Sequence, residues 1–276
     1  MPELPEVETL KRELGRAVIG REIKEVEIHW PKLVAPLSVA EFQKRLRGRR
    51  ITAVERRAKV LIITLTGDLY LLIHLKLTGQ LIFIPRGGKE NLPNQFTRAI
   101  FRFSDGSRLF FNDLRKFGWC RLVDSEQLKN LLKNIGPEPL QKDFNFTFFD
   151  QLLDRYPRRK IKQLLMDQVL IAGLGNIYSA EACFAAKILP TRTAKSLGLV
   201  ARRNLYQKIL KVLKLAIKKK GTSADTYVQL DGTPGGFVPY LRVYGRGGEK
   251  CKVCGALIKK IKLNGRGTHF CPSCQK

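Results

Sequence analysis

Four cysteines near the C-terminal end constrain the fold of this chain most strongly. Cys251, Cys254, Cys271 and Cys274 form two C-x2-C knuckles separated by 16 residues. Each knuckle lets two thiolates of one tight turn approach the same ion, and the stretch between the knuckles is long enough for a β-hairpin. The spacing therefore predicts one structural Zn²⁺ with four sulfur ligands. A pair of disulfides or a redox site is the alternative, which the expected cytoplasmic location disfavours.

Net charge is the second constraint on function. The chain has 51 Lys and Arg residues against 24 Asp and Glu residues, which gives a formal net charge of +27. A domain this basic usually faces a polyanion, so we expect nucleic-acid binding. A ribosomal-type protein or a generally cationic surface remains the alternative.

The sequence also bears on location. It has no window of 18 uninterrupted apolar residues, so we expect no transmembrane helix and no membrane partner. Residues 1–6 are acidic and lack the basic-then-apolar order of a signal peptide. We expect a cytoplasmic, nucleoid-associated monomer. Cys120 and Cys183 stand alone in apolar surroundings, which predicts buried, reduced thiols.

Hydrophobic periodicity changes along the chain and predicts an α+β multidomain fold. Residues 3–18 have helical spacing, and short strands follow up to about residue 123, with a hairpin signal at Asp105-Gly106. Many short strands predict a β-sandwich or a barrel. Period-two alternation begins at residues 26–30, and further strands are expected at residues 60–63, 69–75, 80–84, 98–103 and 107–111. The expected later helices cover residues 126–135, 146–156, 161–167, 177–186 and 201–219.

Three segments of the chain follow from this change of period. Residues 1–123 form a β-rich domain, residues 124–222 form a helical domain, and residues 223–276 form a loop-rich part that ends in the zinc hairpin. In the helical domain, Gly173 and Gly175 break two helices just before Asn176. A helix N-terminus at Asn176 or Ile177 would offer backbone N–H groups to a phosphate. An ordinary turn with Asn176 as the helix cap is the alternative.

Two further positions carry candidate chemistry. Arg266 lies between two glycines at the expected tip of the zinc hairpin and could bind phosphate or be a solvated turn residue. Removal of Met1 would leave Pro2 with a free secondary amine, and α-amino groups titrate far below lysine. Such an amine can attack C1′ of a nucleoside and form an iminium, with Glu3 and Glu6 as acid–base groups. A proline near a helix start without a catalytic role is the alternative.

Taken together, these segments resemble formamidopyrimidine-DNA glycosylase, also called 8-oxoguanine-DNA glycosylase, of the bacterial Fpg type. The matches occur in order over essentially the whole chain, at residues 2–9, 56–59, 74–75, 112–118, 165–167 and 173–178 and through the zinc hairpin to residue 276. The resemblance implies an N-terminal β-sandwich with flanking helices, a helix–two-turn–helix domain and a zinc-finger β-hairpin. It also implies that DNA lies in the cleft between them.

The resemblance implies roles for individual residues. Pro2 would be the nucleophile, Glu3 would donate a proton that opens the deoxyribose ring, and Glu6 would order the nucleophile and nearby water. Lys59 would contact phosphate and assist elimination. The remaining implied DNA contacts are His74, Lys162, Asn176 and Arg266, of which Arg266 also counts as catalytic.

The family also fills the gap left by a flipped base with a Met, an Arg and a Phe. Arg115 and Phe117 match here, but Leu77 stands at the Met position and is less pliable than Met. Lys116 replaces the more familiar second Arg, and Leu114 replaces a Pro. Residues 231–237 match the lesion-capping loop of the family, with a turn-rich connector as the alternative.

The resemblance implies a bifunctional repair enzyme, both a DNA-formamidopyrimidine glycosylase and an abasic-site lyase. It would remove 8-oxoguanine and formamidopyrimidines from duplex DNA and cut the abasic site by β,δ-elimination, without a nucleotide cofactor or a catalytic metal. Its partner would be double-stranded DNA with an oxidised purine or an abasic site. One alternative is an endonuclease VIII-like glycosylase for oxidised pyrimidines, which usually has Gly where this chain has Leu4. The others are a non-catalytic zinc-finger DNA-binding homologue and an RNA-bound zinc-ribbon protein.

Overall fold

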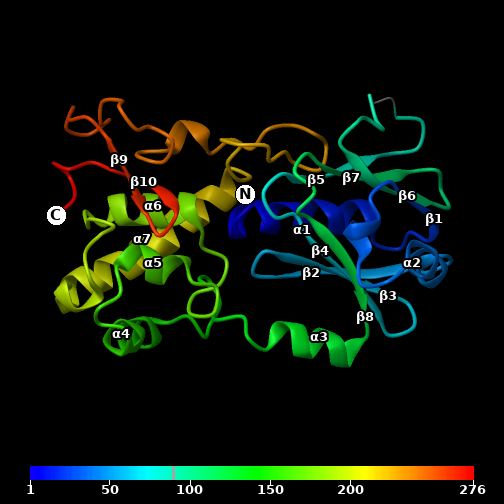
Figure 1. Cartoon of the computed structure of the whole chain (residues 1–276), viewed down its shortest axis with the longest axis horizontal. Coiled ribbons are helices and arrows are strands. Elements are labelled where there is room, and N and C mark those ends of the chain that lie inside the picture. Colours follow the sequence, from blue (N-terminus) through cyan, green and yellow to red (C-terminus); the bar gives the residue numbers. More distant parts are fainter. Residues whose placement is uncertain (89–90) are drawn as a thin grey trace. The chain divides into compact units, whose positions relative to one another are not determined.

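The computed structural model describes residues 1–88 and 91–276 of the chain (Figure 1). Its contacts divide the chain into two units. The first unit comprises residues 1–133 and 219–236, and the second comprises residues 134–218 and 237–276. This grouping differs from the three segments expected from the sequence, because residues 219–236 pack with the N-terminal part of the chain.

The first unit is a β-sandwich with helices around it, as the sequence predicts. One antiparallel sheet has the order β1-β6-β7-β5 and the other the order β2-β3-β4-β8. The first sheet consists of β1 (Ile23–Ile28), β5 (Gly79–Ile84), β6 (Thr97–Phe103) and β7 (Arg108–Asp113). The second consists of β2 (Ile51–Arg57), β3 (Val60–Leu65), β4 (Leu69–His74) and β8 (Trp119–Val123). The helices are α1 (Leu4–Val18), α2 (Val39–Leu46) and α3 (Ser125–Leu132), with a short 3-10 turn at Pro31–Val34.

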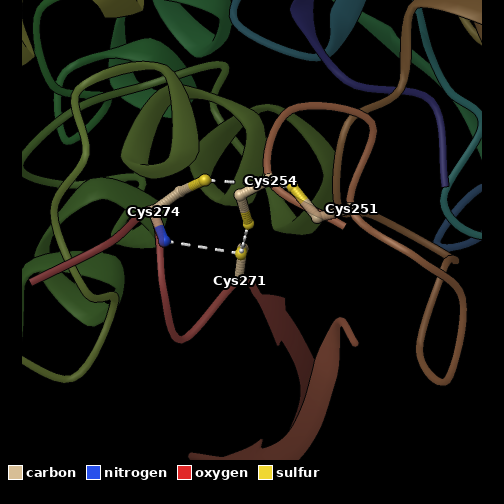
Figure 2. Close-up of side chains that lie close together, drawn as sticks. All are labelled: Cys251, Cys254, Cys271 and Cys274. Carbon is tan, nitrogen blue, oxygen red and sulfur yellow. Dashed lines mark hydrogen bonds between the residues drawn. The ribbon is translucent and has the colours of Figure 1, made fainter. Parts of the chain in front are cut away.

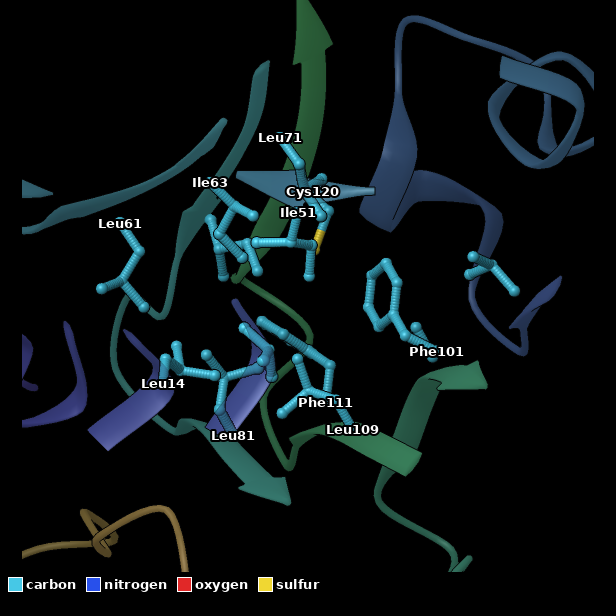
Figure 3. Packing of buried hydrophobic residues seen from close by; sticks show 14 of the residues in the cluster. Leu14, Ile51, Leu61, Ile63, Leu71, Leu81, Phe101, Leu109, Phe111 and Cys120 are labelled. Carbon is cyan, nitrogen blue, oxygen red and sulfur yellow. The ribbon is translucent and has the colours of Figure 1, made fainter. Parts of the chain in front are cut away.

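The sandwich core lies between the inner faces of the two sheets. Phe101 and Phe111 from one sheet and Ile63 from the other are buried there, and α1 adds Leu14 (Figure 3). The outer faces are also covered in part, since α3 packs on an apolar cluster that includes Leu72. Burial of each large apolar side chain contributes about 1.5–3 kcal/mol, so apolar burial is the main stabilising term of this unit.

The prediction missed three elements of the first unit: α2, β2 and β8. A signal for α2 was present, because Ser38 and Glu41 have the Ser-x-x-Glu spacing of a capping box, and the Ser38 hydroxyl accepts a hydrogen bond from the Glu41 N–H at 3.2 Å. In β2 the residue pairing is irregular between Ile51 and Ala53, which blurs the period-two pattern.

The second unit packs helices around a separate apolar core. They are α4 (Phe146–Arg155), α5 (Ile161–Met166), α6 (Asn176–Ala185) and α7 (Leu199–Lys218), with a 3-10 turn at Ala194–Ser196. Tyr178 of α6 is among the largest fully buried side chains of the protein. Cys120 of the first unit and Cys183 of this one are buried free thiols, as expected. Burial raises the pKa of both thiols, which keeps them unreactive.

The second unit ends in the zinc region, residues 237–276, which begins with a 3-10 turn at Val238–Tyr240. Strands β9 (Lys259–Leu263) and β10 (Arg266–Phe270) form the expected hairpin. Asn264 and Gly265 connect them, with φ angles of 47° and 70°. Two positive φ angles are the requirement of a type I′ turn, which favours Asn-Gly. Arg266 is therefore the first residue of β10 and follows the tip, whereas the sequence placed it at the tip.

None of the helices that the structure describes is long and apolar enough to cross a membrane.

Candidate functional site

A buried carboxylate pair marks the N-terminal end of α1. Glu3 and Glu6 each have 1% of their surface exposed, and Pro2 is also buried. The Glu3 N–H donates to Glu6 Oε2 at 2.8 Å, and the two residues form a reciprocal capping box. Burial of a carboxylate without hydrogen bonds costs free energy, and the bonds of the capping box reduce that cost. The helix start thus holds Glu3 and Glu6 next to Pro2.

Glu6 also binds the segment 219–236, which returns to the first unit late in the chain. The Thr222 N–H donates to Glu6 Oε1 at 2.8 Å. Gly221 has a φ of 82°, and a Cβ there would lie 2.9 Å from Glu6 Cγ and Oε1. Only glycine combines that backbone conformation with so close an approach. The segment 219–236, which carries all but the last residue of the expected capping loop, therefore binds a candidate catalytic residue.

Lys59 lies in the two-residue connection between β2 and β3, where Ala58 has a φ of 51°. The side chain of Lys59 is buried. Arg56 steadies this hairpin, because its Nη1 donates to the Ala58 carbonyl at 2.9 Å and its Nε lies 3.0 Å from Glu8 Oε2. Glu8 is on α1, so the helix that presents Glu3 and Glu6 also fixes the hairpin of Lys59.

The electrostatics around Glu8 favour its ionised form. Burial alone would raise the pKa of this carboxyl, but hydrogen bonds from Arg12, Arg56 and Lys11 outweigh burial and lower it. Sequence reasoning did not identify Glu8 or Arg56 as positioning residues. The local signals were the i,i+3 relation of Glu8 to Lys11 and its i,i+4 relation to Arg12.

His74 ends β4 and is uncharged near neutral pH. Its pKa falls to about 3 because the ring is buried and because Lys76 and Lys59 lie nearby. Its Nδ1 accepts the Lys76 N–H at 2.9 Å, and its ring lies 5.5 Å from that of Trp119. A neutral histidine held in this way can donate one hydrogen bond from Nε2.

The three expected wedge residues occupy two turns of the first unit, of which the one at residues 114–117 is exposed. Leu77 is partly exposed, and Phe117 has 52% of its surface exposed. The Arg115 guanidinium lies 4.9 Å from the centroid of the Phe117 ring. Leu114 beside them is also exposed. Leu114 and Phe117 thus give the second of these turns exposed apolar surface that could contact bases.

A second cluster, in the second unit, brings together Lys162, Asn176 and Arg266. Lys162 has only 1% of its surface exposed, so it lies beneath the surface. Its Nζ donates to Asn176 Oδ1 at 2.7 Å and to Thr268 Oγ1 at 2.9 Å. Two members of this cluster, Lys162 and Arg266, line a cavity of about 250 Å³. Its lining includes Lys162, Arg266, Arg159, Asp167 and Asn264.

The arrangement suits an anion better than a cation. Lys162 orients the Asn176 side chain at the N-terminus of α6, where the helix dipole favours negative charge. Asp167 is the one acidic group of the cavity lining, and Arg159 forms an ion pair with it at 2.9 Å. Arg266 is exposed at the start of β10. The cluster can therefore bind a phosphate group.

The four cysteines come together as the sequence predicted. Their Sγ atoms all lie within 4.8 Å of one another (Figure 2). The Cys251–Cys274 and Cys254–Cys271 sulfur pairs are 3.9 and 3.4 Å apart. Tetrahedral zinc with bonds of about 2.3 Å separates sulfurs by roughly 3.8 Å, so the donor set fits the ion. With four thiolates the site has no open position, which makes it structural.

Two buried polar side chains tie the zinc region to the helices, and sequence reasoning missed both. Gln275 accepts the Cys271 N–H and donates to the Ile188 carbonyl, each at 2.8 Å. Glu181 of α6 accepts backbone N–H groups from the stretch 242–244 at 2.8–2.9 Å. The sequence has no signal for either role, because the Ile188 carbonyl and the N–H groups that bind Glu181 are backbone groups distant in the chain.

Three family models match the chain in order. The Formamidopyrimidine-DNA glycosylase N-terminal domain matches residues 1–120, and the Formamidopyrimidine-DNA glycosylase H2TH domain matches residues 135–228. The zinc finger found in FPG and IleRS matches residues 248–276. These matches follow the sandwich, the helices around Asn176 and the four cysteines.

Whole proteins match over the same length. A formamidopyrimidine-DNA glycosylase of Heliobacterium modesticaldum is 45% identical over 278 residues, which cover 100% of both chains. That of Carboxydothermus hydrogenoformans is 40% identical over 276 residues, again with 100% of both covered. The Fpg of Lactococcus lactis in a complex with abasic site containing DNA has a TM-score of 0.90 and 38% identity, with 99% of each chain covered. A mutant of that protein in a complex with Fapy-dG containing DNA also gives 0.90 and 38%, with 100% of each chain covered.

Proposed function

The chain belongs to the formamidopyrimidine-DNA glycosylase family, and we propose that it excises oxidised purines from duplex DNA and then cuts the strand at the abasic site. The observation that carries this proposal is the capping box at the start of α1, which holds two buried carboxylates beside Pro2. Relatives of the chain support the substrate, since structures of the Lactococcus lactis protein contain abasic-site and Fapy-dG DNA.

The first chemical step uses the Pro2 amine, which Met1 removal exposes. Its nitrogen forms a bond to C1′ while the N-glycosidic bond breaks, and the base leaves with the electron pair and takes up a proton. The amine nitrogen loses its proton, and the C1′–O4′ bond then opens. Glu3 donates a proton to O4′, which leaves an iminium between Pro2 and C1′. Glu6 is held between the Glu3 and Thr222 N–H groups, and we assign it the ordering of the amine and water.

The strand is then cut by two eliminations. The iminium acidifies the C2′ proton, and its loss expels the 3′ phosphate. Loss of a further proton through the extended conjugated system expels the 5′ phosphate, and hydrolysis of the remaining iminium frees the enzyme. Lys59, on the hairpin that Arg56 fixes, supplies positive charge for the phosphates.

The second unit would bind the phosphates of the DNA backbone. We assign phosphate contacts to Asn176 and Arg266, and we assign Lys162 the task of orienting Asn176, because its ammonium is buried on the amide oxygen. Zinc at the four cysteines supplies the fixed geometry of the hairpin. We further propose that the protein acts as a monomer in the cytoplasm, at the nucleoid, where its charge of +27 suits the DNA.

Borohydride trapping tests the proposed function. The wild-type protein is mixed with a duplex that contains one 8-oxoguanine, and the adduct is measured by gel and intact mass. A covalent adduct at Pro2, on protein that lacks Met1, is the expected result. The matched control is the same protein with Met1 retained, which should form none.

Other outcomes would select the alternatives. Tight binding without an adduct, on both the lesion duplex and an abasic duplex, would indicate a non-catalytic DNA-binding homologue. An adduct with oxidised-pyrimidine DNA alone would indicate an endonuclease VIII-like enzyme.

A further inference from the structure

Two turns of the first unit carry the residues that we expect to enter the DNA stack. The first wedge turn, residues 74–79, joins β4 to β5 and carries Leu77. The second wedge turn, residues 113–118, joins β7 to β8 and carries Arg115 and Phe117. The turns are far apart in sequence, so something other than chain connectivity must fix the distance between their tips.

The first wedge turn is tightly closed. The Gly79 N–H donates to the Leu75 carbonyl at 2.9 Å, and the Lys76 N–H donates to His74 Nδ1 at 2.9 Å. A Cβ on Gly79 would lie 2.5 Å from the Leu75 carbonyl oxygen, which leaves no room for another residue. Leu77 therefore stands on a turn whose backbone is held on both sides.

The second wedge turn is organised by one buried carboxylate. Asp113 is 1% exposed, and its Oδ1 accepts the Arg115 N–H at 3.1 Å. Its Oδ2 accepts the Gly118 N–H at 2.8 Å. A Cβ on Gly118 would lie 2.6 Å from Phe111 Cζ, so this end of the turn is also closely packed. Asp113 thus fixes the backbone on both sides of Phe117.

Thr78 connects the two turns. Its hydroxyl donates to Asp113 Oδ1, and its own Oγ1 accepts the Arg115 N–H at 3.0 Å. Beside it, Gly79 and Asp113 are paired residues of β5 and β7. The carboxylate of Asp113 therefore accepts hydrogen bonds from both wedge turns, and charge-assisted bonds of this kind are roughly twice as strong as neutral ones.

We propose that Asp113, through Thr78, is a positioning residue that sets the spacing of Leu77 against Arg115 and Phe117, so that the three side chains enter the stack as one unit. This inference rests on the proposed function. When a base leaves the stack, the wedge side chains must fill the gap that it leaves. Misplacement of a positioned group by 1 Å can slow a reaction about a hundredfold. Leu77 increases the demand, because leucine adapts its shape less than methionine.

The test compares substitutions at the connection with a matched one elsewhere. Asp113→Asn and Thr78→Val weaken the hydrogen bonds between the two wedge turns, and Thr78→Ser keeps the hydroxyl that forms them. Asp105→Asn is the control, because Asp105 also accepts a backbone N–H two residues on, from Ser107 at 3.0 Å, in the β6–β7 turn of the same unit. Thermal melting of every variant measures stability separately.

Three readouts separate positioning from general damage. They are single-turnover excision from an 8-oxoguanine duplex, borohydride trapping on a single-stranded abasic oligonucleotide, and fluorescence of 2-aminopurine placed next to the lesion. We expect Asp113→Asn and Thr78→Val to slow duplex excision by about 10- to 100-fold and to reduce the fluorescence increase on binding. Trapping on the single strand should change less than about twofold, since no stack is filled there. Thr78→Ser and Asp105→Asn should behave like the wild type.

Defined results would overturn the inference. The inference is wrong if both Asp113→Asn and Thr78→Val show the wild-type fluorescence change and the wild-type rate of duplex excision. It is also wrong if excision from the duplex and trapping on the single strand fall by the same factor. Failure of the proposed function looks different. In that case the wild type would unstack the probe without excising the base, and a smaller fluorescence change in Asp113→Asn would still support the positioning role.

Discussion

The sandwich of the first unit and the zinc region of the second are stabilised in different ways. In the sandwich, two sheets bury their inner faces against each other, and Phe101, Phe111 and Ile63 are essentially inaccessible. In the zinc region, β9 is largely exposed, and the apolar cluster beside the cysteines is small, with Val243, Ile258 and Phe184 among its members. The hairpin buries too little apolar surface to fold by burial alone, so the metal must supply the difference.

The two regions should therefore lose their structure in different ways. The stability of the sandwich is distributed over many apolar contacts, so one substitution weakens it in proportion to the volume removed. The zinc region depends on four sulfur atoms, so it should be lost as a whole. Trp30 and Trp119, the two tryptophans of the chain, are both in the first unit, so their fluorescence reports on the sandwich alone.

Removal of zinc should have the largest effect. Structural zinc contributes on the order of 10 kcal/mol, so a strong chelator or Cys271→Ser should unfold the hairpin and weaken DNA binding at least about a hundredfold. Fluorescence anisotropy with a lesion duplex measures binding, and the tryptophan melting curve should stay unchanged. Undiminished DNA binding after complete zinc loss would contradict the comparison.

Phe111→Ala should have the opposite pattern. Phe111 is fully buried, so its truncation should lower the free energy of unfolding by about 3–5 kcal/mol. Tryptophan-monitored denaturation measures this loss, and zinc content should stay at one ion. Phe117→Ala is the matched control, since that ring is exposed and its loss should change stability by no more than about 0.5 kcal/mol.

Glu181→Gln should affect the attachment of the zinc region without affecting the sandwich. The amide cannot accept from the same three N–H groups without turning its NH₂ toward one of them, which should cost about 1–3 kcal/mol. Faster zinc release to a chelator is the measurement. Glu249→Gln, which alters an exposed ion pair of the same region, should leave the release rate unchanged.

Acid should destabilise the sandwich through His74, with the smallest effect of the four. The pKa of His74 falls from 6.5 to about 3 on folding, so the unfolded chain binds more protons between these values. The contribution of neutral His74 to the free energy of unfolding is fully present above pH 6.5 and is lost as the pH falls. The loss between pH 7 and 5.5 is about 1 kcal/mol. Denaturant unfolding of His74→Gln should be less pH-dependent than that of the wild type. His29→Gln, at an exposed position, is the control, and equal slopes in both variants would contradict the assignment.

Local patterns in the sequence predicted much of this molecule. The C-x2-C spacing identified the complete metal site, because the four ligands and the hairpin are encoded within 24 residues. Most strands and all of the helices from α3 onward were found from periodicity. The start of α6 at Asn176 was also located, because Gly173 and Gly175 interrupt the apolar pattern there.

The sequence did not predict the polar contacts between residues that are distant in the chain. The resemblance implied that Lys162 contacts DNA, and only the structure shows that its ammonium binds Asn176 and Thr268. Asp113 was part of a matching segment without a role, because its partner Thr78 lies 35 positions earlier. Hydrogen bonds between distant loops leave no periodic trace, so only the folded chain identifies them.

The late return of residues 219–236 has a consequence for synthesis of the protein. Tyr227 and Leu230 complete the sandwich core, and Thr222 completes the hydrogen bonding of Glu6. A ribosome delivers the N-terminus first, but the sandwich lacks these groups until residue 230 has emerged. The second unit likewise lacks its complete set of zinc ligands until Cys274 has emerged. A nascent chain that stops before residue 222 therefore carries Pro2 without a completed site around it.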